Sequence, residues 1–294
     1  MTRRTLFALP GSALLCERLA LAIDAEIGEL AERKFPDGET YLRVEMPVAG
    51  CDALLVAELN HPNDKLLPLV FLADTLRELG APRVGLVAPY LPYMRQDARF
   101  HAGEAVTSRS FARILSSAVD WLITVDPHLH RIAALSEIFT IPATALHSAG
   151  AIGAWIGTNV PAPFIIGPDA ESRQWVEAIA SRASAPFTVL AKTRHGDADV
   201  AESVQALDVD PGCTPVLVDD IISTGHTMIE AVRHLVEQGT PAPLCVAVHA
   251  VFANGAYAAV KNAGAGRIVT TNTIVHPTNG IDVVPIIAQG ITEH

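Results

Sequence analysis

The stretch of residues 216–228, Val-Leu-Val-Asp-Asp-Ile-Ile-Ser-Thr-Gly-His-Thr-Met, constrains the fold of this chain more than any other. It begins with an apolar run rich in β-branched residues, which is typical of a buried strand. That run ends at Asp219 and Asp220, and helical spacing takes over at Met228. The predicted helix places four residues on one face: Met228, Val232, Leu235 and Val236. A buried strand that leads through a tight loop into a helix predicts part of an α/β sheet.

The loop between this strand and this helix has the residue types that hold a phosphorylated sugar. The start of a helix presents unpaired backbone N–H groups and the positive end of the helix dipole, and both favour a phosphate. Ser223, Thr224 and Thr227 add hydroxyl donors, while Asp219 and Asp220 are able to accept hydrogen bonds from sugar hydroxyls or to face a divalent cation. An ordinary connection, in which acids end the strand and hydroxyls cap the helix, has the same spacing. Spacing alone leaves both interpretations open.

A resemblance favours the first interpretation. All thirteen residues of 216–228 resemble the phosphoribosyl-pyrophosphate (PRPP) loop of the phosphoribosyltransferase-like fold. One position departs from the family pattern, because His226 stands where the family usually has a second glycine or another small residue.

The rest of the chain repeats the strand-then-helix plan. Strands are expected at residues 5–9, 41–46, 54–58, 84–88, 121–125, 164–167, 188–192, 244–250 and 267–271. Helices are expected at residues 13–23, 66–79, 107–117, 171–183 and 256–262. Strands that alternate with helices favour parallel sheets with right-handed crossovers, and hence an α/β fold.

The two halves of the chain also echo one another. Residues 54–58, a helix and residues 84–88 parallel residues 216–220, a helix and residues 244–248. We therefore expect two similar phosphoribosyltransferase-like domains, each a mostly parallel sheet flanked by helices. Their predicted bounds are residues 1–145, with 281–294 packed back on them, and residues 146–280. Chance convergence of βαβ units is the alternative explanation of the echo.

Charge and composition narrow the partners. The net charge of −11 over 294 residues argues against a nucleic-acid partner or an anionic membrane surface. Arg3 and Arg4 precede an apolar run in the manner of a signal peptide, but Pro10 and Gly11 interrupt that run, and no segment has the length of a membrane span. The four cysteines show no metal-ligand spacing, so a reduced, cytoplasmic chain is expected.

Further short motifs narrow the family. In chain order they are Phe35-Pro36-Asp37-Gly38-Glu39, Arg95-Gln96-Asp97, Asp126-x-His128, Pro168-Asp169 and Lys192-x-Arg194. Together with residues 216–228 they resemble ribose-phosphate pyrophosphokinase, the PRPP synthetase family, over nearly the whole chain. Each motif alone is weak, but six in the right order are hard to produce otherwise.

This resemblance implies a reaction in which ATP and ribose 5-phosphate give PRPP and AMP, with Mg²⁺ as cofactor. The implied ribose 5-phosphate site comprises Asp219, Asp220, Ser223, Thr224, Gly225, His226 and Thr227. The implied ATP site comprises Phe35, Asp37, Glu39, Arg95, Gln96 and Arg99, the first three forming an adenine site that is completed across a subunit interface. The resemblance further implies that His128 and Asp169 are a magnesium pair and that Lys192 and Arg194 belong to a mobile catalytic loop. A homo-oligomer, either a dimer or a hexamer built from dimers, is implied as well.

These residues also have ordinary structural explanations. His128 fits a half-buried core histidine, Asp169 fits the cap of a following helix, and residues 192–197 fit a solvated turn. Two rival functions stay open. A phosphoribosyltransferase that consumes PRPP explains the loop at 216–228 but leaves Arg95 and the duplicated half without a purpose. A non-catalytic homologue that binds nucleotides and regulates a synthetase is expected to have lost residues that are present here.

Overall fold

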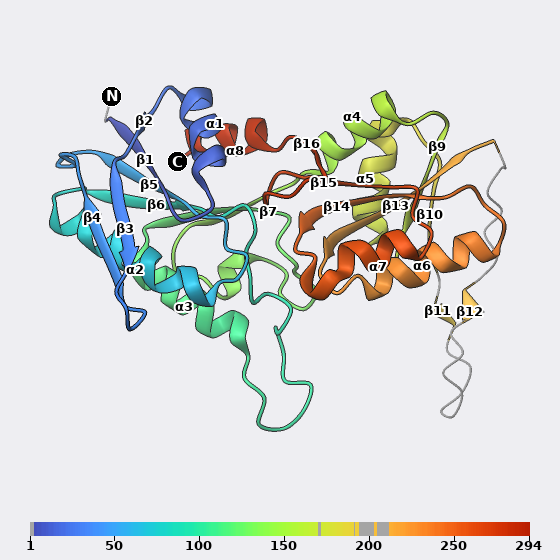
Figure 1. The fold of residues 1–294 in the computed structure, drawn as a ribbon, viewed down its shortest axis with the longest axis horizontal. Coiled ribbons are helices and arrows are strands. Elements are labelled where there is room, and N and C mark those ends of the chain that lie inside the picture. The colour runs from blue at the N-terminus through green and yellow to red at the C-terminus, as the bar shows by residue number, and fades with distance from the viewer. Residues whose placement is uncertain (1–2, 170–171, 191, 194–202, 205–211) are drawn as a thin grey trace. The chain divides into compact units, whose positions relative to one another are not determined.

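The computed structural model describes residues 3–169, 172–190, 192–193, 203–204 and 212–294. The chain divides into two compact units (Figure 1). Unit 1 consists of Met1–His147 and Val284–His294, and unit 2 of Ser148–Val283. Among the described helices, none combines the length and the apolarity that crossing a bilayer requires.

Unit 1 is built on a parallel sheet with the strand order β2-β1-β5-β6-β7-β8. Its strands are β1 (Arg4–Ala8), β2 (Glu26–Ile27), β5 (Asp52–Val56), β6 (Arg83–Val87), β7 (Trp121–Val125) and β8 (Ala143–Leu146). Helices α1 (Ala13–Ile23) and α8 (Val284–Thr292) lie on one face, and α2 (Asn63–Glu78) and α3 (Thr107–Ala118) on the other (Figure 1). A separate antiparallel hairpin, β3 (Leu30–Lys34) with β4 (Thr40–Val44), projects beside α2.

Unit 2 repeats this architecture with the strand order β10-β9-β13-β14-β15-β16, again parallel throughout. Its strands are β9 (Pro163–Gly167), β10 (Phe187–Val189), β13 (Thr214–Ile222), β14 (Leu244–Ala250), β15 (Arg267–Thr271) and β16 (Asn279–Ile281). Helices α4 (Ala149–Asn159) and α5 (Arg173–Ala183) cover one face, and α6 (His226–Glu237) and α7 (Ala256–Asn262) the other. A short antiparallel pair, β11 (Lys192–Thr193) with β12 (Ser203–Val204), follows β10.

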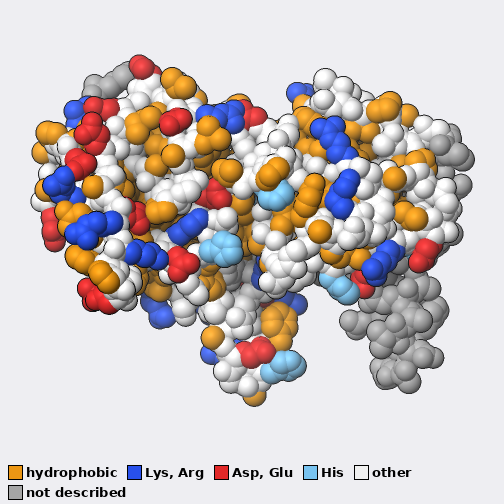
Figure 2. Space-filling model, in the orientation of Figure 1, with side chains coloured by type: hydrophobic (Ala, Val, Ile, Leu, Met, Phe, Trp, Pro, Cys, Tyr) orange, Lys and Arg blue, Asp and Glu red, His pale blue; other side chains and the backbone are white. Residues whose placement is uncertain are grey.

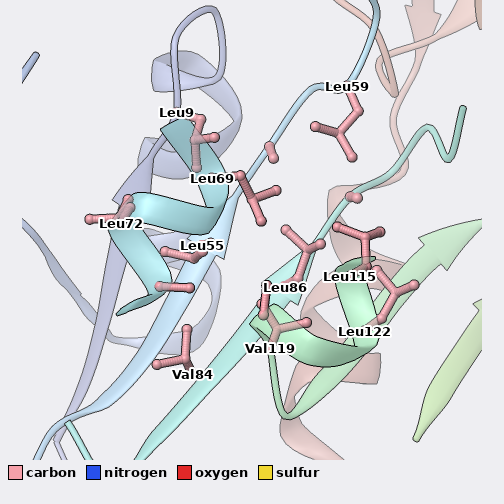
Figure 3. Close-up of a cluster of buried hydrophobic side chains, with 14 of the residues drawn as sticks. Leu9, Leu55, Leu59, Leu69, Leu72, Val84, Leu86, Leu115, Val119 and Leu122 are labelled. Atoms are coloured by element: carbon pink, nitrogen blue, oxygen red, sulfur yellow. The ribbon is translucent and has the colours of Figure 1, made fainter. Parts of the chain in front are cut away.

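The central strands are buried on both faces, which is why their sequences read as continuous apolar runs instead of alternating ones. Every residue of β5, β7 and β14 is buried. In unit 1, Leu55 of β5 and Leu86 of β6 point toward Leu69 of α2 and Leu115 of α3 (Figure 3). At ~1.5–3 kcal/mol for each fully buried leucine, this layer is a major source of the unit's stability.

Each sheet reverses its strand order at one place, and that place sets where a ligand is expected. In unit 1 the chain moves from β1 outward to β2 and then returns to add β5 on the other side. In unit 2 the same reversal falls between β9 and β13. The connections after the two central strands diverge there and leave a crevice at the carboxyl ends of the strands, where ligands bind in open parallel sheets.

The predicted fold class is confirmed, with two local corrections. β13 does not end before Asp219 but continues to Ile222, because residues 219–222 extend the pairing with β14 as far as Ala250. Val236 was expected on the buried face of α6, yet it is 43% exposed. The buried stripe of α6 is centred on Met228, Ala231, Val232 and Leu235, and Val236 lies at its edge.

Side chains of both charges are interspersed over the face of the molecule drawn in Figure 2.

Candidate active site

In unit 2, the loop that joins β13 to α6 lies where the strand order of the sheet reverses, between β9 and β13. We call this place the reversal point of the sheet. Gly225 ends the loop with φ +76° and ψ 5°, and it is the N-terminal cap of α6. This left-handed conformation is open to glycine and costs other residues energy, which explains why the sequence has glycine there. The first turn of α6 then leaves backbone N–H groups that lack partners within the helix, beside the hydroxyl-bearing residues Ser223, Thr224 and Thr227. The predicted ribose 5-phosphate residues of the loop are therefore brought together on one connection.

His226, the departure from the family pattern, fits this geometry. It is the first residue of α6 and does not adopt a positive φ, so a glycine is not required at this position. Its Nε2 lies 3.0 Å from Oε1 of Glu230, one helical turn further along. The imidazole thus lies along the surface of the helix.

The loop is braced by the next connection of the sheet, which the sequence analysis did not identify. The backbone N–H of Phe252 donates to the carbonyl of Ile222 (2.8 Å), and that of Ala253 donates to the carbonyl of Ser223 (3.0 Å). Phe252 pays for this approach with a left-handed backbone, φ +41°, which is unusual for a bulky residue. Strain of this kind is retained where the surrounding structure fixes it.

Carboxylates collect at the same reversal point. Asp219 and Asp220 lie near the end of β13, and Asp169 follows β9. Burial, then the charge of Asp220 and to a smaller extent that of Asp169, raise the pKa of Asp219 well above its ordinary value of 3.8. Three carboxyl groups close enough to affect one another would be relieved by hydroxyl donors or by a cation.

Asp169 has a structural role in addition to any ligand it holds. Its Oδ1 accepts a hydrogen bond from the backbone N–H of Ser172 (2.9 Å), the residue before α5. Asp169 thus closes the turn that leads into α5, but the capping alternative is not realised, because the N-cap of α5 is Ser172 and the described residues give this helix no side-chain cap hydrogen bond. The other carboxylate oxygen of Asp169 is the one to consider for a ligand.

The predicted adenine residues lie on the β3–β4 hairpin of unit 1. The backbone N–H of Phe35 donates to the carbonyl of Glu39 (2.8 Å), and Asp37 Oδ1 accepts from the N–H of Glu39 (3.2 Å). The guanidinium of Arg33 lies 4.6 Å from the ring centre of Phe35 and 4.4 Å from that of Tyr41. The turn is therefore a compact, rigid tip, and Phe35 remains 38% exposed at its end.

Arg95 and Gln96 follow β6 at the carboxyl edge of the first sheet. Arg95 is exposed and Gln96 is half-buried. Arg99, a little further on, donates from Nε to the carbonyl of Glu104 (3.0 Å) and so closes the loop that follows. The next residue along from Gln96, Asp97, is buried and anchors the segment: its Oδ2 accepts from the backbone N–H of Arg131 and its Oδ1 from the guanidinium, both at 3.1 Å.

His128 follows β7 at the same edge and is half-buried, with its ring 4.0 Å from that of His130. The turn before it is strained, since Asp126 has φ +35°. Asp126 also binds Nδ1 of His147 through Oδ1 (3.2 Å), and this hydrogen bond raises the pKa of His147.

The metal pair and the catalytic pair stay predictions. His128 lies in unit 1 and Asp169 in unit 2, and each unit is described by itself. Within the part of the chain that the structure describes, no three histidine, cysteine or acidic side chains gather in a way that would hold a metal ion unaided. Lys192 begins β11, where its backbone alone is described, and Arg194 lies outside the described residues.

Comparison with known proteins identifies the family of both units. A family model described as the N-terminal domain of ribose phosphate pyrophosphokinase matches residues 4–118, and a phosphoribosyl transferase domain model matches residues 134–283.

Named relatives agree over almost their full length. The chain is 35% identical to the ribose-phosphate pyrophosphokinase of Methanopyrus kandleri, covering 94% of both chains. It is 35% identical to ribose-phosphate pyrophosphokinase 2 of Archaeoglobus fulgidus, covering 96% of this chain and 98% of the relative. The crystal structure of phosphoribosylpyrophosphate synthetase from Mycobacterium smegmatis superimposes with a TM-score of 0.85 at 26% identity, covering 99% and 98% of the two chains. This chain therefore belongs to the ribose-phosphate pyrophosphokinase family.

Proposed function

We propose that this protein transfers the β,γ-diphosphoryl group of ATP to the anomeric hydroxyl of ribose 5-phosphate, giving PRPP and AMP. Membership of the ribose-phosphate pyrophosphokinase family supports the reaction. The single structural observation that carries it is the loop at the reversal point of the second sheet, where a helix start and paired carboxylates meet.

The acceptor sugar would bind in unit 2. The N–H groups at the start of α6 and the nearby hydroxyls suit the 5-phosphate, because they are donors at the positive end of a helix. Asp219 and Asp220 suit the hydroxyls of the ribose ring, since ionised carboxylates are pure acceptors. The residues assigned to the phosphate are Ser223, Thr224, Gly225, His226 and Thr227.

ATP would bind through unit 1. The exposed ring of Phe35 offers a surface on which an adenine stacks, and Asp37 and Glu39 offer acceptors for its exocyclic amine. Arg95, Gln96 and Arg99 are assigned to the polyphosphate, where two guanidinium groups and an amide supply donors.

The chemistry moves one group between two oxygens. The anomeric oxygen forms a bond to the β-phosphorus, the bond from that phosphorus to the α,β-bridging oxygen breaks, and AMP leaves with the electron pair. The hydroxyl proton is lost as the new bond forms. A transfer of this type needs alignment and charge stabilisation from the protein instead of a covalent intermediate. We assign Lys192 and Arg194 to the stabilisation of the charge on the transferred group.

The residues present fit Mg²⁺, a cation that prefers oxygen ligands and is commonly held by one or two carboxylates together with substrate phosphates. Burial and, after it, the charges of Asp220 and Asp169 raise the pKa of Asp219, and a divalent cation beside this carboxyl group would favour its ionised form. We assign Asp169 and His128 to this ion. When bound, it neutralises charge on the polyphosphate and polarises the phosphorus under attack.

The proposal extends to the roles of the two units, the assembly of the protein and its location in the cell. We propose that Met1–His147 with Val284–His294 acts as the ATP domain and Ser148–Val283 as the acceptor domain. We further propose a cytoplasmic homo-oligomer, a dimer or a hexamer built from dimers, in which the adenine site is completed by a neighbouring copy.

One assay separates this function from its rivals. Purified protein is given Mg²⁺, ATP and ribose 5-phosphate, and AMP and PRPP are measured by ion-exchange chromatography with a control that lacks ribose 5-phosphate. Equal amounts of AMP and PRPP that depend on the sugar phosphate are expected. A folded protein that releases no AMP above the control would overturn the proposal. Nucleotide formation from PRPP and a free base would instead identify a phosphoribosyltransferase, and nucleotide binding without any turnover a regulatory homologue.

A further inference from the structure

The side chain of Gln96 is held in one orientation by the start of helix α3. The hydroxyl of Thr107 donates to Oε1 of Gln96 (3.3 Å), and the backbone N–H of Ser108 donates to the Gln96 carbonyl (3.4 Å). Both donors come from the first two residues of α3. Gln96 is therefore fixed twice by one helix terminus, once at its backbone and once at its amide.

The orientation of this amide matters because its two ends have nearly the same shape and opposite hydrogen-bonding character. The oxygen accepts, whereas the NH₂ group donates. A helix N-terminus carries a partial positive charge, so it favours the amide oxygen over the amide NH₂. With the oxygen held against Thr107, the NH₂ group points away from α3 and is presented as a donor.

We propose that Thr107 is a positioning residue for ATP: its hydroxyl holds the Gln96 amide with the NH₂ group turned toward acceptors on the nucleotide. This inference rests on the proposed function, because Gln96 has been assigned to ATP there. Polyphosphate oxygens are acceptors only, so an amide turned the other way would present its oxygen to them and repel them.

The backbone of the segment does not depend on Thr107. Asp97 anchors it independently, through the two hydrogen bonds from Arg131 at 3.1 Å. Loss of the Thr107 hydroxyl should therefore free the amide of Gln96 to rotate while the segment keeps its place. The effect would appear in ATP affinity and leave the fold intact.

The neighbouring Ser108 provides a matched control. Its Oγ is buried and has no hydrogen-bond partner among the described residues. Thr107→Val removes a hydroxyl that binds Gln96, whereas Ser108→Ala removes one on the same helical turn that does not.

The test measures the affinity for a non-hydrolysable ATP analogue by isothermal titration calorimetry on the whole protein, together with KM for ribose 5-phosphate. Since a neutral hydrogen bond contributes ~0.5–1.5 kcal/mol, Thr107→Val should weaken ATP analogue binding roughly two- to thirteenfold. Thr107→Ser keeps the hydroxyl and should bind the ATP analogue with wild-type affinity. Ser108→Ala should also bind the analogue with wild-type affinity. KM for ribose 5-phosphate should not move. If Thr107→Val does not fold, Thr107→Ala removes the same hydroxyl with a smaller side chain.

The decisive arm is a double-mutant cycle with Gln96→Ala. In that background Thr107→Val should have no further effect on the affinity, because there is no amide left to orient. An equal effect in both backgrounds, or no effect of Thr107→Val at all, would overturn the inference. If Gln96→Ala itself leaves the affinity unchanged, then the assignment of Gln96 to ATP fails, and the inference falls with it, while the AMP assay still decides the overall reaction.

Discussion

A pair of glycines at the two ends of helix α6 allows the ribose 5-phosphate assignment to be tested against an internal control. Gly225 precedes α6 and Gly239 follows it, and both have φ +76°. Alanine is equally strained at both positions, at ~1–2 kcal/mol for a left-handed conformation. The two glycines lie at opposite ends of α6, because the 12 residues of the helix and its C-cap Gln238 lie between them. The helix alone is about 18 Å long at ~1.5 Å per residue.

The surroundings of the two glycines differ, and so Gly225→Ala should be less stable than Gly239→Ala. A Cβ on Gly225 would lie 3.0 Å from Cγ2 of Val260 and 3.5 Å from Cβ of Ala256, whereas a Cβ on Gly239 meets no heavy atom within 4 Å among the described residues. Crowding of this kind adds ~1 kcal/mol, the lower end of the range for overpacking. Gly225→Ala should therefore lower the free energy of unfolding by about 2–3 kcal/mol, and Gly239→Ala by about 1–2 kcal/mol.

The two variants should differ much more in their KM for ribose 5-phosphate than in their free energy of unfolding. Distortion at Gly225 displaces backbone donors assigned to the phosphate, and a hydrogen bond to a charged group contributes ~1.5–3 kcal/mol. KM for ribose 5-phosphate should thus rise roughly 10- to 100-fold in Gly225→Ala and stay at the wild-type value in Gly239→Ala. The assay measures AMP formation over a range of ribose 5-phosphate concentrations at saturating ATP, and urea unfolding gives the stabilities. Equal KM values in two variants that have both lost stability would refute the assignment of this loop.

Three further predictions concern other parts of the molecule. Lys192→Ala should lower turnover by orders of magnitude while ATP affinity stays nearly unchanged, since its charge is assigned to the transition state; a large loss of ATP affinity in calorimetry would contradict that role. Burial raises the pKa of the Cys16 and Cys245 thiols to about 12, so a thiol reagent at pH 8 should label neither until the protein unfolds, as peptide mass analysis would show. Burial lowers the pKa of His276 below 6.5; the unfolded chain then takes up the proton first on acidification, and stability falls as the pH drops below 6.5. In denaturant titrations between pH 7 and pH 5, His276→Asn should lose less stability on acidification than the wild type. An equal loss in both proteins would contradict the lowered pKa of His276.

The sequence predicts the parts of the fold in which local and tertiary preferences agree. Strands β7, β14 and β15 and helix α7 begin and end where the apolar runs and the helical spacing place them. Their residues are buried on both faces of a strand or on one face of a helix, so the pattern of apolar residues is the pattern of burial.

Helix α4 escaped prediction because packing selected residues that disfavour helices locally. Three of its 11 residues are glycines. A Cβ on Gly153 would lie 2.6 Å from the carbonyl oxygen of Ile179 and 2.6 Å from Cβ of Arg182, so the helix packs against α5 only with glycine there. Glycine weakens an isolated helix by ~1 kcal/mol, and the compensating contacts lie about 30 residues away in the sequence. The contacts of Asp97 and Phe252 escaped prediction for the same reason, since their partners come from distant parts of the chain. Those of Gln96 are nearer, at the start of α3, but they depend on how the loop before that helix folds back.

The two units have the same topology, but different side chains lie where their sheets reverse strand order. This difference explains why the proposed function assigns them different ligands. In unit 1 the connections that follow β1 and β5 are hydrogen-bonded to one another, because Ser12 Oγ accepts from the backbone N–H of Glu58 (2.8 Å). Lys65 Nζ donates to the carbonyl of Glu58 (2.5 Å) and to the side chain of Asn60. Lys65 is half-buried, and this burial lowers the pKa of its ammonium. At the corresponding place in unit 2, burial and the neighbouring acids raise the pKa of Asp219, and the start of helix α6 is capped by a glycine, Gly225. The first arrangement satisfies its charges internally, whereas the second is stabilised most by a ligand that brings hydroxyls, phosphate and a cation. Under the proposed function, a duplicated fold would in this way present one acceptor site, and the first sheet would position ATP through the connections after β6 and β7.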